Sequence, residues 1–196
     1  MSDERPSVVI LAGPNGAGKS TVAPALLEGA LGVTEFVNAD DIARGLSAFN
    51  PEGASIAAGR VMLARLRELA QQRVSFAFET TLASRSFAPW LVNLKSSGYT
   101  VHLVFLWLPS AEFALVRVAG RVREGGHGVP PETVRRRYDK GLRNLFGLYE
   151  EIASTWRLYD ASSSQPRMIA ARLDNHGVKV YDHDIWALIR PSEGDR

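Results

Sequence analysis

The stretch of this sequence with the most specific chemistry is Gly13-Pro-Asn-Gly-Ala-Gly-Lys-Ser20, which matches the pattern GxxxxGK[ST]. Glycines at 13, 16 and 18 allow the backbone to curl around a phosphate with its N–H groups pointing inward, where larger side chains would block the approach. Lys19 is expected to bridge the β- and γ-phosphates of ATP, and the Ser20 hydroxyl to ligate Mg²⁺. The expected ATP-binding residues of this segment are Gly13, Asn15, Gly16, Ala17, Gly18, Lys19, Ser20 and Thr21.

Two carboxylates follow short apolar runs and are candidates for a second part of the site. Asp40 comes just after residues 34–38, and Glu79 directly follows Val74–Phe78. Ligands of open α/β sheets gather at the carboxyl ends of the strands. Glu79 could bind substrate or a Mg²⁺-bound water, or it could be solvated at the sheet edge. Asp41 is interpreted as a helix-start residue that stabilises the helix dipole.

Basic residues flank a segment rich in glycine and proline, Glu124–Pro131. Arg117 and Arg121 are four residues apart and therefore share one helical face just before this segment. Such a face can neutralise phosphates, or it can simply be solvated. Because glycine and proline disfavour regular structure, this segment is predicted to form a mobile loop.

The elements that must position these residues alternate between strand and helix patterns. Ser7–Ala12 is short, β-branched and apolar on both faces, as in a central parallel strand. Helical periodicity covers residues 51–72, 111–122, 132–148 and 181–189, and further strands are predicted at 34–38, 74–78, 100–108, 156–160 and 168–173. This alternation predicts one α/β domain over 1–196, with a P-loop NTPase fold and a mainly parallel sheet between helices.

Composition limits how the protein can be stabilised, where it is located and what it can bind. The chain has 196 residues, 45% of them hydrophobic, which is enough for a core without disulfides or metals. It has no cysteine, so disulfides and thiolate zinc sites are excluded, and a cytoplasmic location is expected. With 23 basic and 21 acidic residues, and no apolar run near the ~20 residues of a spanning helix, neither nucleic acid nor membrane is an expected partner.

Several motifs together resemble the zeta toxin family of P-loop kinases, over most of the chain. They are Gly13 to Thr21, Phe36-Val-Asn-Ala-Asp-Asp-Ile-Ala43, Phe76-Ala-Phe-Glu-Thr-Thr-Leu82, Arg121-Val-Arg-Glu-Gly-Gly-His-Gly-Val-Pro130 and Arg136-Arg-Tyr138. The resemblance implies a fold similar to nucleoside monophosphate kinases. It also implies ATP and Mg²⁺ as cofactors and an antitoxin protein as a possible partner.

The resemblance assigns roles residue by residue. Asp40 would orient the acceptor hydroxyl and take its proton, and Glu79, beside Thr80, would face the acceptor. Arg85 would meet acceptor phosphates or a carboxylate. Arg117 would stack on adenine, Arg121 would neutralise the transferring phosphoryl group, and Arg136 or Arg137 would approach from the far side. The resemblance also implies that residues 123–131 form a lid, in which the larger toxins tend to carry a further arginine where this chain has His127.

The expected activity is transfer of the ATP γ-phosphate to a hydroxyl of a small acceptor such as UDP-N-acetylglucosamine. Two alternatives stay open: an ATP-binding or ATP-hydrolysing regulatory protein, and a housekeeping nucleotide or metabolite kinase with no toxin role. The absence of an acidic residue just after 101–108 argues against a motor ATPase, whereas Asp40 and Glu79 suit an acceptor pocket.

Overall fold

A computed structural model describes residues 5–50, 53–126, 128–173 and 177–190 of the chain. Within these residues, seven strands form one sheet in the order β2-β3-β1-β4-β5-β6-β7. The strands are β1 (Ser7–Ala12), β2 (Glu35–Val37), β3 (Phe76–Thr80), β4 (Thr100–Trp107), β5 (Thr155–Asp160), β6 (Arg167–Arg172) and β7 (Lys179–Val180). The first five in the spatial order are parallel to one another. Strand β6 pairs antiparallel with β5, and β7 pairs antiparallel with β6. The expected α/β fold with a mainly parallel sheet is confirmed.

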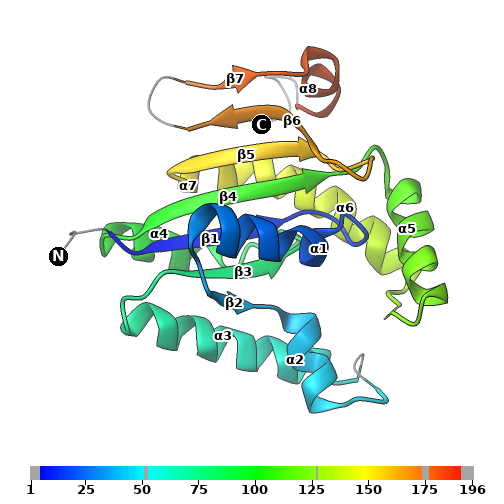
Figure 1. Cartoon of the computed structure of the whole chain (residues 1–196), viewed down its shortest axis with the longest axis horizontal. Coiled ribbons are helices and arrows are strands. Elements are labelled where there is room, and N and C mark those ends of the chain that lie inside the picture. Colours follow the sequence, from blue (N-terminus) through cyan, green and yellow to red (C-terminus); the bar gives the residue numbers. More distant parts are fainter. Residues whose placement is uncertain (1–4, 51–52, 127, 174–176, 191–196) are drawn as a thin grey trace.

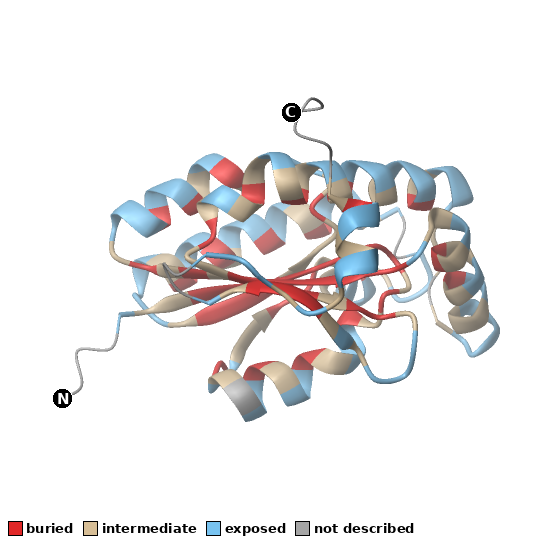
Figure 2. Ribbon diagram, turned by 90° about the horizontal axis from the view of Figure 1, so that it is seen from above, coloured by how far each residue is buried: buried red, intermediate tan, exposed pale blue. Residues whose placement is uncertain are grey.

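The helices lie on both faces of this sheet, and Figure 2 shows the buried sheet between them. They are α1 (Lys19–Pro24), α2 (Ala39–Leu46), α3 (Ser55–Gln71), α4 (Ala88–Ser96), α5 (Ala111–Arg123), α6 (Pro131–Asn144), α7 (Glu150–Ile152) and α8 (His183–Ile189). Two π-helical segments, Ala25–Ala30 and Leu145–Tyr149, continue α1 and α6. Figure 1 shows α2 and α3 beside β2 at one end of the sheet and α8 beside β7 at the other.

The side chains of β1 alternate between two hydrophobic cores. Val8 and Ile10 pack into a cluster with residues of α3, α4 and the second π-helical segment, whereas Val9 and Leu11 face residues of α1 and α5. Successive strand residues point to opposite faces, so a strand covered on both sides must be apolar throughout. Burying each such Val, Leu or Ile side chain contributes roughly 1.5–3 kcal/mol.

The register brings the candidate residues to one edge of the sheet. Ala12 of β1 pairs with Thr80 of β3, and Val37 of β2 pairs with Phe78. The Gly13 N–H donates to the Thr80 carbonyl at 3.3 Å. The glycine-rich turn, the end of β3 and the start of α2 are therefore neighbours.

Element boundaries differ from the predictions where side chains decide them. Helix α2 begins at Ala39, because Asn38 caps it by accepting a hydrogen bond from the Asp40 N–H at 2.8 Å. The strand expected over 74–78 covers Phe76–Thr80 and so includes Glu79. Helix α3 begins at Ser55, not at 51, and α8 begins at His183, where Asp182 is the cap.

Some elements had no counterpart in the sequence analysis. Helix α4, strand β7 and both π-helical segments were not predicted. The first π-helical segment directly follows Pro24, which has no N–H to donate to the carbonyl four residues earlier. Among the described residues, no helix combines the length and apolarity needed to cross a membrane.

Candidate active site

The glycine-rich turn between β1 and α1 adopts backbone conformations that favour glycine. Gly13, Gly16 and Gly18 have φ angles of 141°, 80° and 80°. A Cβ at Gly13 would lie 2.3 Å from the Leu106 carbonyl oxygen of β4, and one at Gly16 would lie 2.9 Å from the Ala114 carbonyl oxygen of α5. Two of the glycines are thus required by neighbouring backbone as well as by any phosphate, a packing constraint that the motif alone does not reveal.

Lys19, the first residue of α1, is buried and folded back over the turn. Its Nζ donates to the carbonyl oxygens of Gly13 and Pro14, each at 2.9 Å, and lies 3.6 Å from Glu79 Oε1. Burial lowers the pKa of Lys19 from its ordinary value, and the Glu79 and Asp40 carboxylates oppose this shift. The ammonium group is therefore held at the mouth of the turn by acceptors that an anionic ligand could replace.

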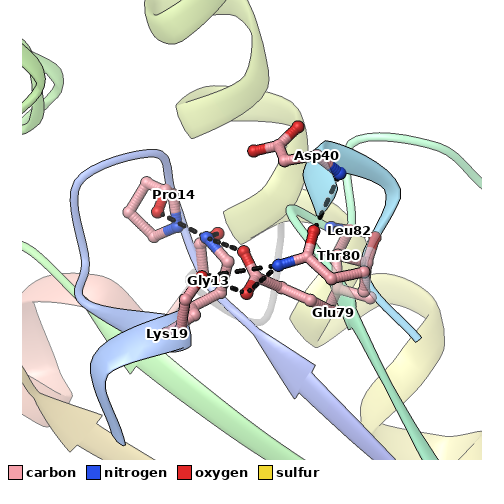
Figure 3. Close-up of polar contacts among 9 residues, drawn as sticks. Gly13, Pro14, Lys19, Asp40, Glu79, Thr80 and Leu82 are labelled. Carbon is pink, nitrogen blue, oxygen red and sulfur yellow. Dashed lines mark hydrogen bonds and ion pairs between the residues drawn. The ribbon is translucent and has the colours of Figure 1, made fainter. Parts of the chain in front are cut away.

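Glu79 connects the turn to the next strand. Its Oε2 accepts a hydrogen bond from the Ser20 hydroxyl at 2.8 Å and one from Asn38 Nδ2 at 3.1 Å. Figure 3 shows Lys19 and Glu79 facing each other in this network. No acidic residue directly follows β4, and the carboxylate beside Ser20 comes instead from β3, the other neighbour of β1.

The Ser20 hydroxyl and the Glu79 carboxylate, whose oxygens lie 2.8 Å apart, are the type of oxygen ligand that Mg²⁺ prefers. Mg²⁺ prefers oxygen ligands and is usually held by one or two protein groups, with waters and substrate phosphates completing the octahedron. In the described part of the chain, no group of three or more His, Cys, Asp or Glu side chains could hold a metal ion. This donor set fits a cation that arrives with a nucleotide better than a resident structural metal.

Asp40 lies at the start of α2, where its backbone N–H is bound by the Asn38 cap. Figure 3 shows its side chain near the Lys19–Glu79 pair without a contact drawn to either residue. Asp41, one residue later, pairs with Arg44 on the exposed side of the same helix. Both aspartates are exposed, but their surroundings differ: Asp41 pairs with Arg44, whereas Asp40 lies near Lys19 and Glu79.

Two cavities meet at these residues. The first, here named the P-loop pocket, has a volume of about 410 Å³ and is formed by the turn, α1 and α5. The second, the lateral pocket, has a volume of about 380 Å³ and extends between α2, the segment after β3, and α6. Both are lined by Asn15, Lys19, Asp40 and Glu79. A ligand in one pocket could thus react with a ligand in the other at this shared wall.

The predicted arginines divide between the two pockets. Arg117 and Arg121 line the P-loop pocket, and Arg136 and Arg137 line the lateral pocket. Arg117 is held in place, since its Nη2 donates to the Ser162 carbonyl at 2.8 Å and its guanidinium lies 5.2 Å from the Phe113 ring centroid. Arg136 and Arg137 thus lie on the lateral-pocket side of Lys19, and Arg117 and Arg121 on the P-loop side.

Not every expected residue lies at the site. Arg85 is exposed and lines neither pocket, although its neighbour Ser84 lines the lateral pocket. Helix α5 ends at Arg123 and α6 begins at Pro131, so the predicted lid corresponds to the connection between them. His127 lies outside the described residues. The mobility of this connection stays a prediction.

Two contributors were missed or undervalued in the sequence. Asn38, to which the sequence analysis gave no role, donates to Glu79 through its amide nitrogen and caps α2 through its amide oxygen. Lys140 lines the lateral pocket together with Arg136 and Arg137. Its spacing of four and three residues from them on one predicted helix was a signal that could have identified it.

Comparisons with known proteins bear on the fold and the family of the chain. A Haemophilus influenzae protein, described only as uncharacterized, is 31% identical over 130 residues, which cover 66% of this chain and 91% of that protein. In crystal structures of the AvrRxo1-ORF1:AvrRxo1-ORF2 complex, a chain has a similar fold, with TM-scores of 0.76 with sulphate ions and 0.74 with ATP, at 19% identity. This likeness covers 95% of the present chain, which spans 64% of the length of that one.

A chain of the PezAT toxin–antitoxin system of Streptococcus pneumoniae is also similar, with a TM-score of 0.68 at 17% identity over 90% of this chain and 76% of that one. Identities this low establish the fold alone. The profile of the zeta toxin family, however, matches residues 1–184, nearly the whole chain. The protein thus belongs to the zeta toxin family.

Proposed function

We propose that this protein transfers the γ-phosphate of Mg²⁺-bound ATP, held in the P-loop pocket, to a hydroxyl group of a small molecule in the lateral pocket. The observation that carries the proposal is the shared wall, where Asn15, Lys19, Asp40 and Glu79 line both cavities. Direct transfer needs the attacking hydroxyl and the phosphorus to meet in line, shielded from water. A protein that only hydrolysed ATP would need no second cavity of this size.

Each residue has a role that follows from its position. Lys19 exchanges the Gly13 and Pro14 carbonyls for oxygens of the β- and γ-phosphates. Ser20 and Glu79 hold Mg²⁺, which supplies neutralisation of phosphate charge when it is bound. Arg121 adds positive charge to the transferring group from the P-loop pocket, and Arg117 contacts the adenine ring.

Asp40 acts on the acceptor. As the oxygen of the hydroxyl forms a bond to the γ-phosphorus and the bond to the β-phosphate oxygen breaks, the carboxylate accepts the hydroxyl proton. ADP and the phosphorylated acceptor are the products. Phosphoryl-transfer sites act mainly by positioning and charge stabilisation. This matches a site with several positively charged side chains, in which Asp40 is assigned as the base.

The lateral pocket also indicates the class of acceptor. Arg136, Arg137 and Lys140 line it, against the carboxylates of Asp40 and Glu79. An acceptor with a phosphate or carboxylate group suits such a surface better than a neutral sugar. UDP-N-acetylglucosamine, a diphosphate with free sugar hydroxyls, is the first acceptor to test. The toxin–antitoxin complexes among the similar structures also suggest that an antitoxin protein could cover this site.

The test is ADP release by the wild-type protein with ATP and Mg²⁺, measured with a panel of nucleotide sugars, nucleosides, dinucleotides and neutral sugars against a reaction without acceptor. The proposal expects release to depend on one class of acceptor and a phosphorylated product to appear by mass spectrometry. Equal ADP release with and without every acceptor would instead support a regulatory ATPase.

A further inference from the structure

The segment between β3 and α4 forms one wall of the lateral pocket and has an unusual backbone. Thr81, Ala83, Ser84 and Phe87 line the pocket, and between them Leu82 is fully buried with a φ of 55°. Left-handed backbone is unfavourable for a leucine and persists only where the surroundings hold it. The conformation of residues 81–84 must therefore be imposed by contacts from elsewhere in the fold.

Those contacts come from α6 and the π-helical segment that continues it, and they involve three carbonyl groups of residues 81–84. A Cβ on Gly141 would lie 2.4 Å from the Thr81 oxygen, so only glycine permits this approach. Asn144 Nδ2 donates to the Leu82 carbonyl at 2.7 Å, and the Tyr149 hydroxyl donates to the Ser84 carbonyl at 2.7 Å.

The second π-helical segment explains how Asn144 and Tyr149 can both contact residues 81–84. In an α-helix, residues five apart point roughly 140° away from each other. Residues Leu145–Tyr149 form a π-helix, in which the hydrogen-bonded repeat is five residues. Asn144 and Tyr149 are separated by that repeat and both contact the 81–84 segment. Such π-helical turns occur frequently at functional sites.

Tyr149 is well suited to this task. Its side chain is almost fully buried, and burial raises the pKa of Tyr149 to about 12 despite smaller opposing effects of the Phe87 backbone and Arg85. The hydroxyl therefore remains a donor throughout the physiological pH range. Arg136, Arg137 and Lys140 of α6 also line the pocket, so this helix both contributes lining side chains and contacts the 81–84 segment.

We propose that Asn144 and Tyr149 are positioning residues that hold residues 81–84 as a preformed wall of the lateral pocket, and so set the affinity for the acceptor without affecting that for ATP. This inference rests on the proposed function in that the lateral pocket is taken as the acceptor site. Neither residue lines the P-loop pocket.

The first experiment measures amide hydrogen exchange and needs no acceptor. In Asn144→Ala and Tyr149→Phe, exchange in residues 81–87 is expected to rise about 10-fold, the effect of losing one hydrogen bond, while exchange in the glycine-rich turn stays unchanged. Tyr99→Phe is the matched control, since the Tyr99 hydroxyl is a buried donor to the Val74 carbonyl at 2.9 Å and Tyr99 lines neither pocket. Unchanged exchange in residues 81–87 of both variants overturns the proposal.

The second experiment separates the two ligands. With UDP-N-acetylglucosamine, or whichever panel compound the wild-type protein phosphorylates, both variants are expected to raise the acceptor KM about 10-fold and to leave the ATP KM and ATP-analogue affinity within about twofold. Equal losses for both ligands would mean a general structural role and would overturn the proposal.

Failure of the proposed function can be distinguished from failure of the positioning proposal. If the wild-type protein phosphorylates no acceptor while exchange of residues 81–87 rises in both variants, the support by Asn144 and Tyr149 stands but the assignment of the pocket to an acceptor is wrong. Gly141→Ala provides an independent variant, because its methyl group should displace the Thr81 carbonyl and raise exchange in the same segment.

Discussion

The Ser20 hydroxyl and the Glu79 carboxylate, 59 residues apart in the chain, are joined by a hydrogen bond of 2.8 Å. This bond links the start of α1, just after the glycine-rich turn, to the neighbouring strand β3. Both oxygens are available as ligands for the Mg²⁺ ion of a bound nucleotide. We expect Glu79→Gln to lower turnover by about 10²-fold or more and to raise the Mg²⁺ concentration needed for half-maximal rate, because a neutral amide binds Mg²⁺ more weakly.

The control for this variant is Glu35→Gln. Glu35, on β2, pairs with Arg65 and lines neither pocket. Its change should alter neither turnover nor the Mg²⁺ dependence. A Glu79→Gln protein with wild-type Mg²⁺ dependence would show that Glu79 is not a metal ligand.

Lys19→Ala should abolish detectable ATP-dependent turnover and leave the fold intact. The side chain contacts the backbone of its own turn and Glu79, so its loss removes a phosphate-binding charge but no part of the apolar core. Stability should change by no more than about 1–2 kcal/mol, since two carbonyl groups lose a donor while a buried charge is removed. Turnover and urea unfolding of the same preparation are the measurements, and near-normal turnover would contradict the catalytic assignment.

Asp40→Asn separates a kinase from an ATP-binding switch. The change preserves side-chain volume and the backbone cap from Asn38, so ATP-analogue affinity should be retained while acceptor phosphorylation falls by about 10²-fold or more, as for a lost general base. Asp41→Asn, on the exposed side of the same helix, is the control and should have little effect. If Asp41→Asn is the more damaging variant, the roles of the two aspartates are exchanged; if Asp40→Asn abolishes ATP binding itself, Asp40 acts chiefly near Mg²⁺.

The protein should lose stability at alkaline pH partly through Tyr149. The pKa of its hydroxyl is about 12 in the folded state and about 10 in the unfolded state, so the unfolded chain releases the proton first as the pH rises. This contribution to stability is complete below pH 10 and is lost between about pH 10 and 12. Urea unfolding at pH 9 and pH 11 should show a smaller loss for Tyr149→Phe than for the wild type, and an equal loss would exclude this origin.

Local sequence determined much of the site because its parts are contiguous. Gly13 to Ser20 needs only the strand before it and the helix after it, both visible as an apolar run and a helical pattern. Alternation of strands and helices likewise predicted the parallel sheet, and a parallel sheet brings the carboxyl ends of its strands to one edge. Asp40 and Glu79 could therefore be assigned to the same edge as Lys19.

The tertiary structure decided the contacts made across that edge. Strand order, not chain order, placed β3 beside β1, and so made Glu79 the partner of Ser20 where the sequence analysis had looked to the end of β4. Local patterns could not reveal the π-helical turn at Leu145–Tyr149 or the left-handed backbone at Leu82. The residues of that turn do not favour a π-helix by themselves, and leucine does not favour a positive φ. Both are stabilised by partners more than 60 residues away in the chain, and hydrogen bonds of that range become available only once the sheet has brought its helices together.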